Sequence, residues 1–364
     1  MKTTLGDIFE IGSGGTPSKA HPEYYGGEIP WVKTGDLKEE YLFSVEDCIT
    51  EEGLKNSSAK MYEPGTVLIA MYGATIGATS ILKLDACTNQ ACAAFKPSKD
   101  VKPEYLYYFL RSKKKKFISD GVGGAQPNIS AGYLKKVQID VRNLEEQDRI
   151  ITILDGVNSV IQERQRELDL LDELIKARFV EFFGDYYKNH VNEKQLDEIC
   201  DFIDYRGKTP EKSESGIPLI TAKNVKDNRF SIEPQEFIPE ENYEDVMTRG
   251  IPMVNDVLFT TEAPLGNVCR IPDVYDKFCV GQRLITMQPH KNVINSEYLE
   301  HALASNEFQD KMWQKSSGST VKGIRSKLLV LLTIPVPPIE LQEQFKEFLL
   351  QVDKSKFGRA IAYI

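Results

Sequence analysis

The chain has 364 residues, of which 41% are hydrophobic and 27% charged, and its formal net charge is −9. This length allows two or three domains with full cores, and the composition is that of a soluble globular protein. We find no apolar run long enough to span a membrane and no leader sequence, which predicts a cytoplasmic protein.

The six cysteines contain no C-x-x-C pair, and the four histidines do not cluster with them. This pattern predicts buried reduced thiols and argues against a metal site or a disulfide framework. The net acidity does not exclude a nucleic-acid partner, because residues 143–184 alone carry ten acidic against five basic residues. A basic surface can exist locally in a chain that is acidic overall.

The first element is a glycine-rich loop within "GSGGTPSKA" (12–20). It lacks the third glycine of a dinucleotide-binding loop, and Pro17 stands where the phosphate-binding helix would begin. We therefore interpret it as a loop that presents side chains. Further along, residues 66–71 predict a strand, residues 103–117 predict a helix, and residues 258–261 and 296–313 predict their counterparts.

The chain repeats itself with a period of about 190 residues. "LGDIFEIGSGGTP" (5–17) returns as "LDEICDFIDYRGKTP" (196–210), and "EIPWVKTGDL" (28–37) returns as "GIPLITAKNV" (216–225). "TVLIAMYGATIGATSIL" (66–82) returns as "DVLFTTEAPLGNVCRI" (256–271), and further matches follow in the same order. The period is too long for a solenoid, so the sequence predicts a duplicated domain.

Each copy ends in a predicted helix with apolar residues at heptad spacing. We expect the first helix to close at "FFGD" (182–185). Its seam consists of Ile150, Leu154, Val157, Ile161, Leu168, Leu171 and Ile175. The seam of the second helix starts with Leu341, Phe345, Phe348 and Val352. The first stripe would span roughly 50 Å. Two such helices would most simply pair antiparallel, in a pseudo-twofold arrangement that places the two globular copies at opposite ends.

The motifs "GGTPS", "IPWVKTGDL", "YGATIGATS", "TNQACAAF" and "LEEQDRIITILDGVNSVI", together with "IPVPPIELQEQF" in the second copy, resemble the specificity subunit of a type I restriction–modification system. The resemblance implies an α+β fold in which two β-rich target recognition domains are separated by long helices that form an antiparallel coiled coil. We place recognition domain 1 at 1–142, a spacer helix at 143–184, recognition domain 2 at 185–337 and a shorter spacer helix at 338–364.

The resemblance also implies a function. Each recognition domain would read one half of a bipartite, asymmetric site in double-stranded DNA. The helices would dock modification (methyltransferase) subunits, two by expectation, and restriction subunits would join later. The resemblance implies no catalysis by this chain, so S-adenosylmethionine, ATP and Mg²⁺ are expected on the partners. The sequence agrees, because it contains no D/N-P-P-Y/F methyltransferase motif.

Candidate DNA-contacting residues are hydrogen-bonding and basic side chains in predicted loops. The glycines of the first loop are expected to free backbone N–H groups for phosphates. Trp31 and Trp313 are expected in the core. In the first copy the candidates are Ser13, Gly14, Gly15, Thr16, Ser18, Lys19, Lys33, Thr34, Tyr72, Thr75, Asn89, Gln90, Lys113, Lys114, Gln126 and Asn128.

In the second copy we select the residues at the corresponding places. An ordinary turn or a solvated surface remains the alternative for each of them. They are Arg206, Lys208, Thr209, Lys223, Asn224, Glu262, Leu265, Gln282, Arg283, Ser317, Ser319, Thr320 and Lys322.

The second helix is shorter than the first and turns into "GRAIAYI", so the chain looks truncated at its C-terminus. We expect this to expose Leu168, Leu171, Leu174, Ile175 and Phe179 on the first helix. That face would then self-associate or impair docking of one modification subunit. The alternative function is a truncated or silent copy that acts only as a protein-interaction module.

Overall fold

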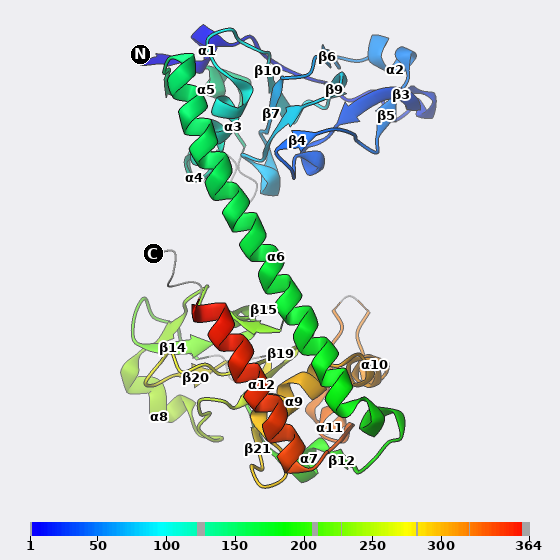
Figure 1. Ribbon diagram of the computed structural model, residues 1–364, viewed down its shortest axis with the longest axis vertical. Coiled ribbons are helices and arrows are strands. Elements are labelled where there is room, and N and C mark those ends of the chain that lie inside the picture. Colours follow the sequence, from blue (N-terminus) through cyan, green and yellow to red (C-terminus); the bar gives the residue numbers. More distant parts are fainter. Residues whose placement is uncertain are drawn as a thin grey trace. The chain divides into compact units, whose positions relative to one another are not determined.

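The computed structural model describes residues 2–121, 128–205, 210–226, 228–281, 283–319 and 321–358, with only the backbone described for 355–358. The chain divides into two compact units, Met1–Arg164 and Gln165–Ile364. Their boundary falls inside the longest helix, α6 (Leu144–Lys188), which is drawn in green in Figure 1.

Unit 1 combines short strands with short helices. Its strands are β1 (Lys2–Thr4), β2 (Ile11–Ser13), β3 (Tyr25–Val32), β4 (Tyr41–Leu42), β5 (Cys48–Ile49), β6 (Met61–Tyr62), β7 (Val67–Ala70), β8 (Thr79–Leu82), β9 (Ala86–Thr88), β10 (Cys92–Phe95) and β11 (Gln138–Asp140). Its helices before α6 are α1 (Leu5–Ile8), η1 (Pro22–Tyr24), η2 (Thr34–Asp36), α2 (Glu51–Lys55), η3 (Gly73–Thr75), α3 (Pro103–Ser112), α4 (Lys114–Asp120) and α5 (Ala131–Lys135).

Unit 2 has the same kind of elements. Its strands are β12 (Glu193–Gln195), β13 (Cys200–Asp204), β14 (Ile217–Ile220), β15 (Val225–Lys226), β16 (Arg229–Phe230), β17 (Phe237–Ile238), β18 (Val257–Thr261), β19 (Leu265–Arg270), β20 (Cys279–Val280), β21 (Leu284–Pro289) and β22 (Thr333–Pro335). Its helices after α6 are α7 (Leu196–Ile199), η4 (Ala222–Asn224), η5 (Glu240–Asn242), α8 (Tyr243–Val246), α9 (Ser296–Ala304), α10 (Asn306–Lys315), α11 (Ser326–Leu329) and α12 (Ile339–Gly358).

The two units share one strand order, which confirms the duplication predicted from the sequence. In unit 1 the main sheet runs β2-β10-β7-β8-β4, and in unit 2 it runs β13-β21-β18-β19. The second sheet runs β5-β3-β9-β6 in unit 1 and β17-β14-β20 in unit 2, with β3 parallel to β9 and β14 parallel to β20. In each copy the first strand pairs with the last, β1 with β11 and β12 with β22.

The apolar run 67–70 forms a strand that is buried on both faces, because successive side chains of β7 point to opposite sides of its sheet. Val67 and Ile69 contribute to a core cluster with the helices α3 and α4, whereas Leu68 and Ala70 contribute to a cluster with the second sheet. The same alternation occurs in β18, where Phe259 packs toward α9 and α10 and Leu258 packs toward β14 and β20. Each main sheet is therefore an inner layer.

Both helices predicted over 103–117 and 296–313 are divided in two. Ser112 Oγ donates to Phe109 O at 2.7 Å at the junction of α3 and α4, and the turn at Lys113 lets Phe117 reach the core. Ser305 has extended backbone angles, and its Oγ accepts a hydrogen bond from Phe308 N that begins α10. Trp313, expected in the core, is 46% exposed because α10 buries Phe308 and Met312 instead; Trp31 is buried as predicted.

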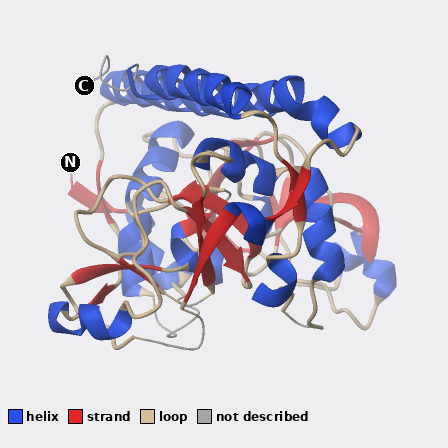
Figure 2. Cartoon of the chain, turned by 90° about the horizontal axis from the view of Figure 1, so that it is seen from below, coloured by secondary structure: helices blue, strands red, loops and turns tan. Residues whose placement is uncertain are grey.

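Helix α6 continues past "FFGD" to Lys188, and Tyr187 in this added turn packs near Phe179. Helix α12 runs antiparallel to the C-terminal part of α6, and the two lie side by side (Figures 1 and 2). Phe345 of α12 has its ring centroid 5.6 Å from that of Phe179 and 5.4 Å from that of Phe183. One turn further along α12, the guanidinium carbon of Arg178 lies over the ring of Phe348, 5.4 Å from its centroid.

The expected seam is therefore formed in part. Leu171, Ile175, Leu341, Phe345, Phe348 and Val352 belong to or pack on one core cluster. Ile150, Leu154 and Leu168 are half-buried.

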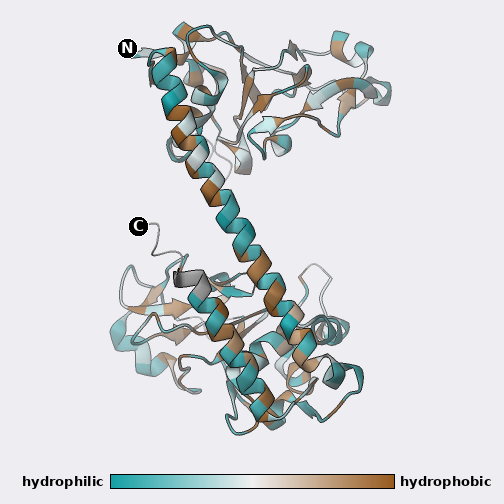
Figure 3. Ribbon diagram, in the orientation of Figure 1, coloured by the Kyte–Doolittle hydropathy of each residue, from teal (hydrophilic) through white to brown (hydrophobic). Residues whose placement is uncertain are grey.

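Two of the seam expectations are wrong. Val157 and Ile161 are exposed on α6, and Figure 3 shows that apolar residues recur along this helix. The expectation that a short second helix would expose Ile175 and Phe179 is also wrong, because they pack against the start and middle of α12; of that set, only Leu174 is exposed.

Candidate nucleic-acid interface

In unit 1 several loops meet at one end of the main sheet. Strand β2 ends at Ser13 where β10 begins, and β7 ends there as well, since Met71 N donates to Ala91 O at 2.8 Å. The parallel strands β3 and β9 also end there, with Asn89 N donating to Val32 O at 2.9 Å. We call residues 16–19, 33–34, 72–77, 89–90 and 128 the loop edge of unit 1.

The structure brings together side chains that are far apart in the sequence. Thr16 Oγ1 donates to Gln90 Oε1 at 2.5 Å, and Tyr72 forms an isolated bridge with Asn128. The aliphatic part of Lys114 lies against Gly77, where an added Cβ would stand 2.9 Å from Lys114 Cγ. A tyrosine, two amides, a hydroxyl and a lysine thus share one edge, which is a set of groups suited to bases and phosphates.

The expectation that Gly14 and Gly15 free their backbone for phosphates is wrong. Both are buried, and Gly15 N donates to Thr88 O at 2.9 Å. A Cβ on Gly14 would stand 1.7 Å from the same carbonyl oxygen, so glycine is needed for the close approach of this loop to β9. Ser13 and Thr16 are half-buried, which leaves Ser18 and Lys19 as the exposed residues of this stretch.

The basic side chains of unit 1 differ in their contacts and in their exposure to solvent. Lys33 forms an ion pair with Asp47, and this hydrogen bond raises the pKa of the lysine above its ordinary value. Lys113 lies with Nζ 5.5 Å from the ring centroid of Phe109. Lys19 and Lys114 are exposed, so they are the better phosphate candidates.

Among the remaining candidates of this edge, Thr34 is half-buried, and Thr75 Oγ1 donates to Tyr72 O at 3.2 Å. Asn89 Oδ1 accepts from Ala91 N at 3.0 Å, so this side chain orders its own turn.

Unit 2 has an equivalent edge. Thr261 N donates to Arg283 O at 2.9 Å, Gly281 N donates to Ile220 O at 2.7 Å, and Glu262 forms an isolated bridge with Gly323. These are the counterparts of the Met71–Ala91, Asn89–Val32 and Tyr72–Asn128 pairs of unit 1. The loop edge of unit 2 comprises the described parts of 210–212, 221–223, 262–264, 281–283 and 317–323.

A cavity of about 140 Å³ lies at this edge, with Lys212, Lys223, Glu236 and Arg283 in its wall. Glu236 Oε1 lies 2.8 Å from Lys223 Nζ, and Glu236 Oε2 lies 2.8 Å from Lys212 Nζ. Burial acts to raise the pKa of Glu236, but the hydrogen bonds from the two lysines outweigh it and lower the pKa below its ordinary value. Arg283 Nε is 3.1 Å from Glu262 Oε1, so acids and bases alternate along the edge.

Two candidates of the second copy are not positioned to read bases. Asn224 is buried, and its Oδ1 accepts from Thr221 N at 2.9 Å while its Nδ2 donates to Ser231 O at 2.9 Å. The same role belongs to Asp36 in unit 1, whose Oδ2 accepts from Lys33 N. Leu265 is buried in the core cluster beneath α9, since it is the first residue of β19.

Ser317, Ser319 and Lys322 are exposed on the loop that faces Glu262, and Ser317 exchanges backbone hydrogen bonds with Gly323. Six candidates lie outside the described residues: Gln126, Arg206, Lys208, Thr209, Gln282 and Thr320.

Lys212 was missed by the sequence reasoning. It follows "TPE" as Lys19 follows "TPS", so the internal repeat could have identified it.

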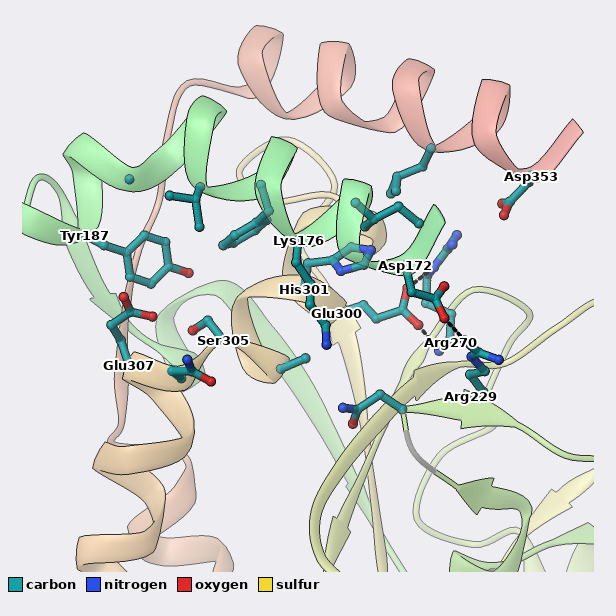
Figure 4. Close-up of a pocket in the computed structure, with 18 residues that line it drawn as sticks. Asp172, Lys176, Tyr187, Arg229, Arg270, Glu300, His301, Ser305, Glu307 and Asp353 are labelled. Carbon is teal, nitrogen blue, oxygen red and sulfur yellow. Dashed lines mark hydrogen bonds and ion pairs between the residues drawn. The ribbon is translucent and has the colours of Figure 1, made fainter. Parts of the chain in front are cut away.

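A larger cavity, of about 710 Å³, lies in unit 2 beside α6, α9 and β19 (Figure 4). Some of its charged lining residues form ion pairs: Arg270 contacts Glu300 at 2.7 Å as well as Glu297 at 2.9 Å, and Asp172 contacts Arg229.

Within the described part of the chain, no group of three or more His, Cys, Asp or Glu residues could hold a metal ion. All six cysteines are free, and burial raises the pKa of Cys87, Cys92 and Cys279 to about 12, so these thiols are unreactive near neutral pH. None of the helices among the described residues is long and apolar enough to cross a membrane.

Comparison with known proteins adds a family. Residues 1–170 and 188–358 each match the model of the type I restriction modification DNA specificity domain. The chain is 34% identical over 190 residues to the type I restriction enzyme MjaIX specificity subunit of Methanocaldococcus jannaschii, which is 50% of this chain and 44% of that protein. It is 31% identical over 177 residues to the EcoR124I/EcoR124II specificity subunit of Escherichia coli, which is 46% of this chain and 44% of that protein.

The chain thus spans less than half the length of these two relatives in the matched segments. A solved structure concerned with complex assembly and conformational transition of the type I R-M system contains a chain similar in fold. The structural match covers 100% of this chain and 93% of that chain, with a TM-score of 0.50 and 18% sequence identity.

Proposed function

Since this chain belongs to the type I restriction modification DNA specificity family, we propose that it is a sequence-specific DNA-binding subunit. The single observation that carries the proposal is the loop edge. In each unit, hydrogen-bonding and basic side chains from loops that are distant in the sequence lie at the equivalent end of the unit's own main sheet. Phosphate contacts from exposed lysines such as Lys19 and Lys114 would set the position, and the amides and Tyr72 would read base edges.

We further propose that the DNA site is bipartite and asymmetric, with one half read by each unit. The two edges share a backbone frame but differ in the side chains they present. Tyr72 corresponds to Glu262, Asn128 corresponds to Gly323, and Lys33 corresponds to Thr221. Because a glutamate accepts from a cytosine amino group and an asparagine pairs best with adenine, equivalent positions would prefer different bases.

The partners follow from the same proposal. Val157 and Ile161 leave an apolar stripe exposed on α6, which suits docking of helices from modification subunits, and restriction subunits would join that complex. Methyl transfer, ATP use and cleavage would belong to those subunits, so S-adenosylmethionine, ATP and Mg²⁺ would bind there. This chain would contribute no catalytic residue. A genomic target would place it in the cytoplasm.

The alternative is a chain that serves only as a protein-interaction module. DNA binding separates the two. The full chain would be used to select duplexes from a random library, and its affinity for the selected site would be measured from 50 to 200 mM salt. A DNA reader loses affinity steeply with salt, since each neutralised phosphate releases a counterion, and keeps its sequence preference.

A matched pair of variants assigns the edge. Glu262→Ala is expected to change base preference in one half of the selected site and leave the other half unchanged. Asp273→Ala removes an equally negative, exposed side chain on the loop beyond the opposite end of β19, and it is expected to change neither half. Binding without sequence preference, or no salt-dependent binding, would instead support the interaction module.

A map of modified bases in the host genome, with and without this gene, tests the same proposal in the cell. Loss of methylation at one bipartite motif supports it. Unchanged methylation contradicts a working specificity subunit.

A further inference from the structure

Each unit contains a buried glutamine at the start of its spacer helix. Gln147 in the first turn of α6 and Gln342 in the first turn of α12 are both fully buried. A buried amide is costly unless its hydrogen bonds are made. Helix propensity does not require glutamine at these positions, since leucine or alanine would serve as well. Their presence in both copies calls for a reason beyond helix formation.

The hydrogen bonds of the two glutamines are the same. Gln147 Oε1 accepts from Lys102 N at 2.9 Å, and Gln342 Oε1 accepts from Asn295 N at 3.0 Å. Both donors, Lys102 and Asn295, are residues that immediately precede a helix of the recognition fold, α3 in unit 1 and α9 in unit 2. Each carboxamide oxygen therefore holds the chain at the entry to that helix.

The amide nitrogens complete the pattern. Gln147 Nε2 donates to Asp100 O and to Arg142 O, both at 2.8 Å. Gln342 Nε2 donates to Val293 O at 3.1 Å and to Pro337 O at 2.8 Å. Each glutamine thus joins three segments of its unit: the spacer helix, the loop before α3 or α9, and the strand-to-helix connection.

Two further contacts repeat at the same place. Tyr105 OH donates to Asp140 O at 3.0 Å, and Tyr298 OH donates to Pro335 O at 2.7 Å. The residue after each glutamine is an acid that binds the side chain of the residue before α3 or α9: Asp148 pairs with Lys102, and Glu343 Oε1 accepts from Asn295 Nδ2 at 3.0 Å. We call these two sets of contacts the glutamine joints.

We propose that the glutamine joints fix the angle between each recognition domain and its spacer helix, and thereby set the spacer length of the bipartite DNA site. This inference rests on the proposed function. Gln147 and Gln342 are positioning residues in it, because they act through the helix and touch no DNA.

The length of α6 determines how accurately the angle at the first joint must be held. At about 1.5 Å per residue, the 45 residues of α6 give a length of about 68 Å. A change of about 3° at its first turn would displace a point at its far end by about 3.5 Å, which is roughly the rise of one base pair. One base pair also rotates a half-site by about 35° around the duplex. A joint that selects one spacer length must therefore be rigid to within a few degrees, and a saturated buried network supplies such rigidity.

The test uses the full chain and four methionine variants. Gln147→Met and Gln342→Met keep the side-chain length and remove every hydrogen bond of the amide. Gln162→Met on α6 and Gln344→Met on α12 change the same residue type at exposed positions of the same helices. Tyr105→Phe removes one hydrogen bond of the first joint, and it provides a milder variant if Gln147→Met does not fold.

The first readout is the affinity for duplexes that carry the selected half-sites at the selected spacing and at spacings one base pair shorter or longer. We expect Gln147→Met and Gln342→Met to lower the discrimination between these spacings at least tenfold while each half-site keeps its base preference. Tyr105→Phe is expected to have a smaller effect of the same sign, and the two control variants none. An equal loss of affinity at all spacings would show a merely structural role and would overturn the proposal.

The second readout needs no DNA. Spin labels at Lys60→Cys and Ser159→Cys, both exposed in unit 1, report the distance between the recognition domain and α6 in a Cys48→Ser background. We expect the distance distribution to widen at least twofold with Gln147→Met and to be unchanged with Gln162→Met. A distribution as narrow as that of the parent chain would overturn the joint. A parent chain that selects no bipartite DNA would overturn the proposed function and the role in spacing, whereas this measurement still reports on the joint.

Discussion

Phe345 is the side chain that holds α12 in place, and replacing it with alanine is the most direct test of the helix pairing. It is fully buried, and its ring has centroid distances of 5.6, 6.0 and 5.4 Å to Phe179, Phe182 and Phe183. Truncation of a buried phenylalanine costs about 3–5 kcal/mol, and aromatic pairs add about 0.5–1.5 kcal/mol each. The better helix propensity of alanine returns only about 0.5 kcal/mol. The expected loss is therefore about 3 kcal/mol or more.

The assays are urea unfolding and thermal unfolding, combined with hydrogen exchange. A loss of about 3 kcal/mol in a unit of this size lowers its Tm by roughly 6–12 °C, and amides of α12 and α9 are expected to exchange faster. Fluorescence of Trp31, measured in a Trp313→Phe background, reports unit 1, which should unfold as before. Leu350→Ala, at a position 51% exposed on the same helix, is the control and is expected to change stability by less than about 0.5 kcal/mol. A loss below about 1 kcal/mol for Phe345→Ala would refute the pairing as described.

Three other predictions follow from single contacts. Gly14→Ala places a Cβ against Thr88 O and is expected to destabilise unit 1 by about 3 kcal/mol, measured as unfolding at lower urea concentration by Trp31 fluorescence. Gly35→Ala is the control and is expected to be neutral, because there is open space around Gly35. Equal stability of the two variants would contradict the close approach of Gly14 to Thr88. The hydrogen bond from His190 comes first among the contacts that lower the pKa of Glu193 from 4.5 to about 2. The contribution of ionised Glu193 to stability is therefore present above pH 4.5 and lost as the pH falls from about 4.5 toward 2. Glu193→Gln should reduce the dependence of the free energy of unfolding on pH in that window. An unchanged pH dependence would contradict this role of Glu193. Arg270→Ala leaves two mostly buried glutamates without their partner and should cost about 3–5 kcal/mol in urea unfolding, and a cost under about 1 kcal/mol would show that the pair is dispensable.

The repeat in the sequence predicts the fold well because it records a shared backbone. The apolar runs at 66–71 and 258–261 predict the central strands β7 and β18. The division of the helices at Lys113 and Ser305 depends on local hydrogen bonds that override a continuous apolar pattern. Of the two junctions, only the one at Ser305 could be predicted from the sequence, because serine is a preferred residue at the start of a helix.

The site could be predicted only in outline. The sequence predicts that the candidate residues lie in loops next to strands, but it does not predict that these loops meet at one edge, because that depends on the strand order. Which polar side chains remain available was not readable, since Asn224 satisfies its own turn. An ungapped match of "IPWVKTGDL" with "IPLITAKNV" aligns Asn224 with Asp36 and would have revealed that role. The repeat aligns "VQIDVRNLEEQDRI" (137–150) with "LTIPVPPIELQEQF" (332–345) and so places Gln147 opposite Gln342. The backbone groups that these glutamines bind lie far away along the chain, so the joints themselves could not be predicted from the repeat.

The pairing of first with last strand has a consequence for how such chains can change. Lys2 lies opposite Asp140 in the β1–β11 ladder, and Glu193 lies opposite Pro335 in the β12–β22 ladder. Entry and exit of each recognition domain are therefore neighbours. A segment whose two ends meet behaves as a cassette: it can be replaced as one block, or its connectivity can be permuted, without stretching the chain at either junction.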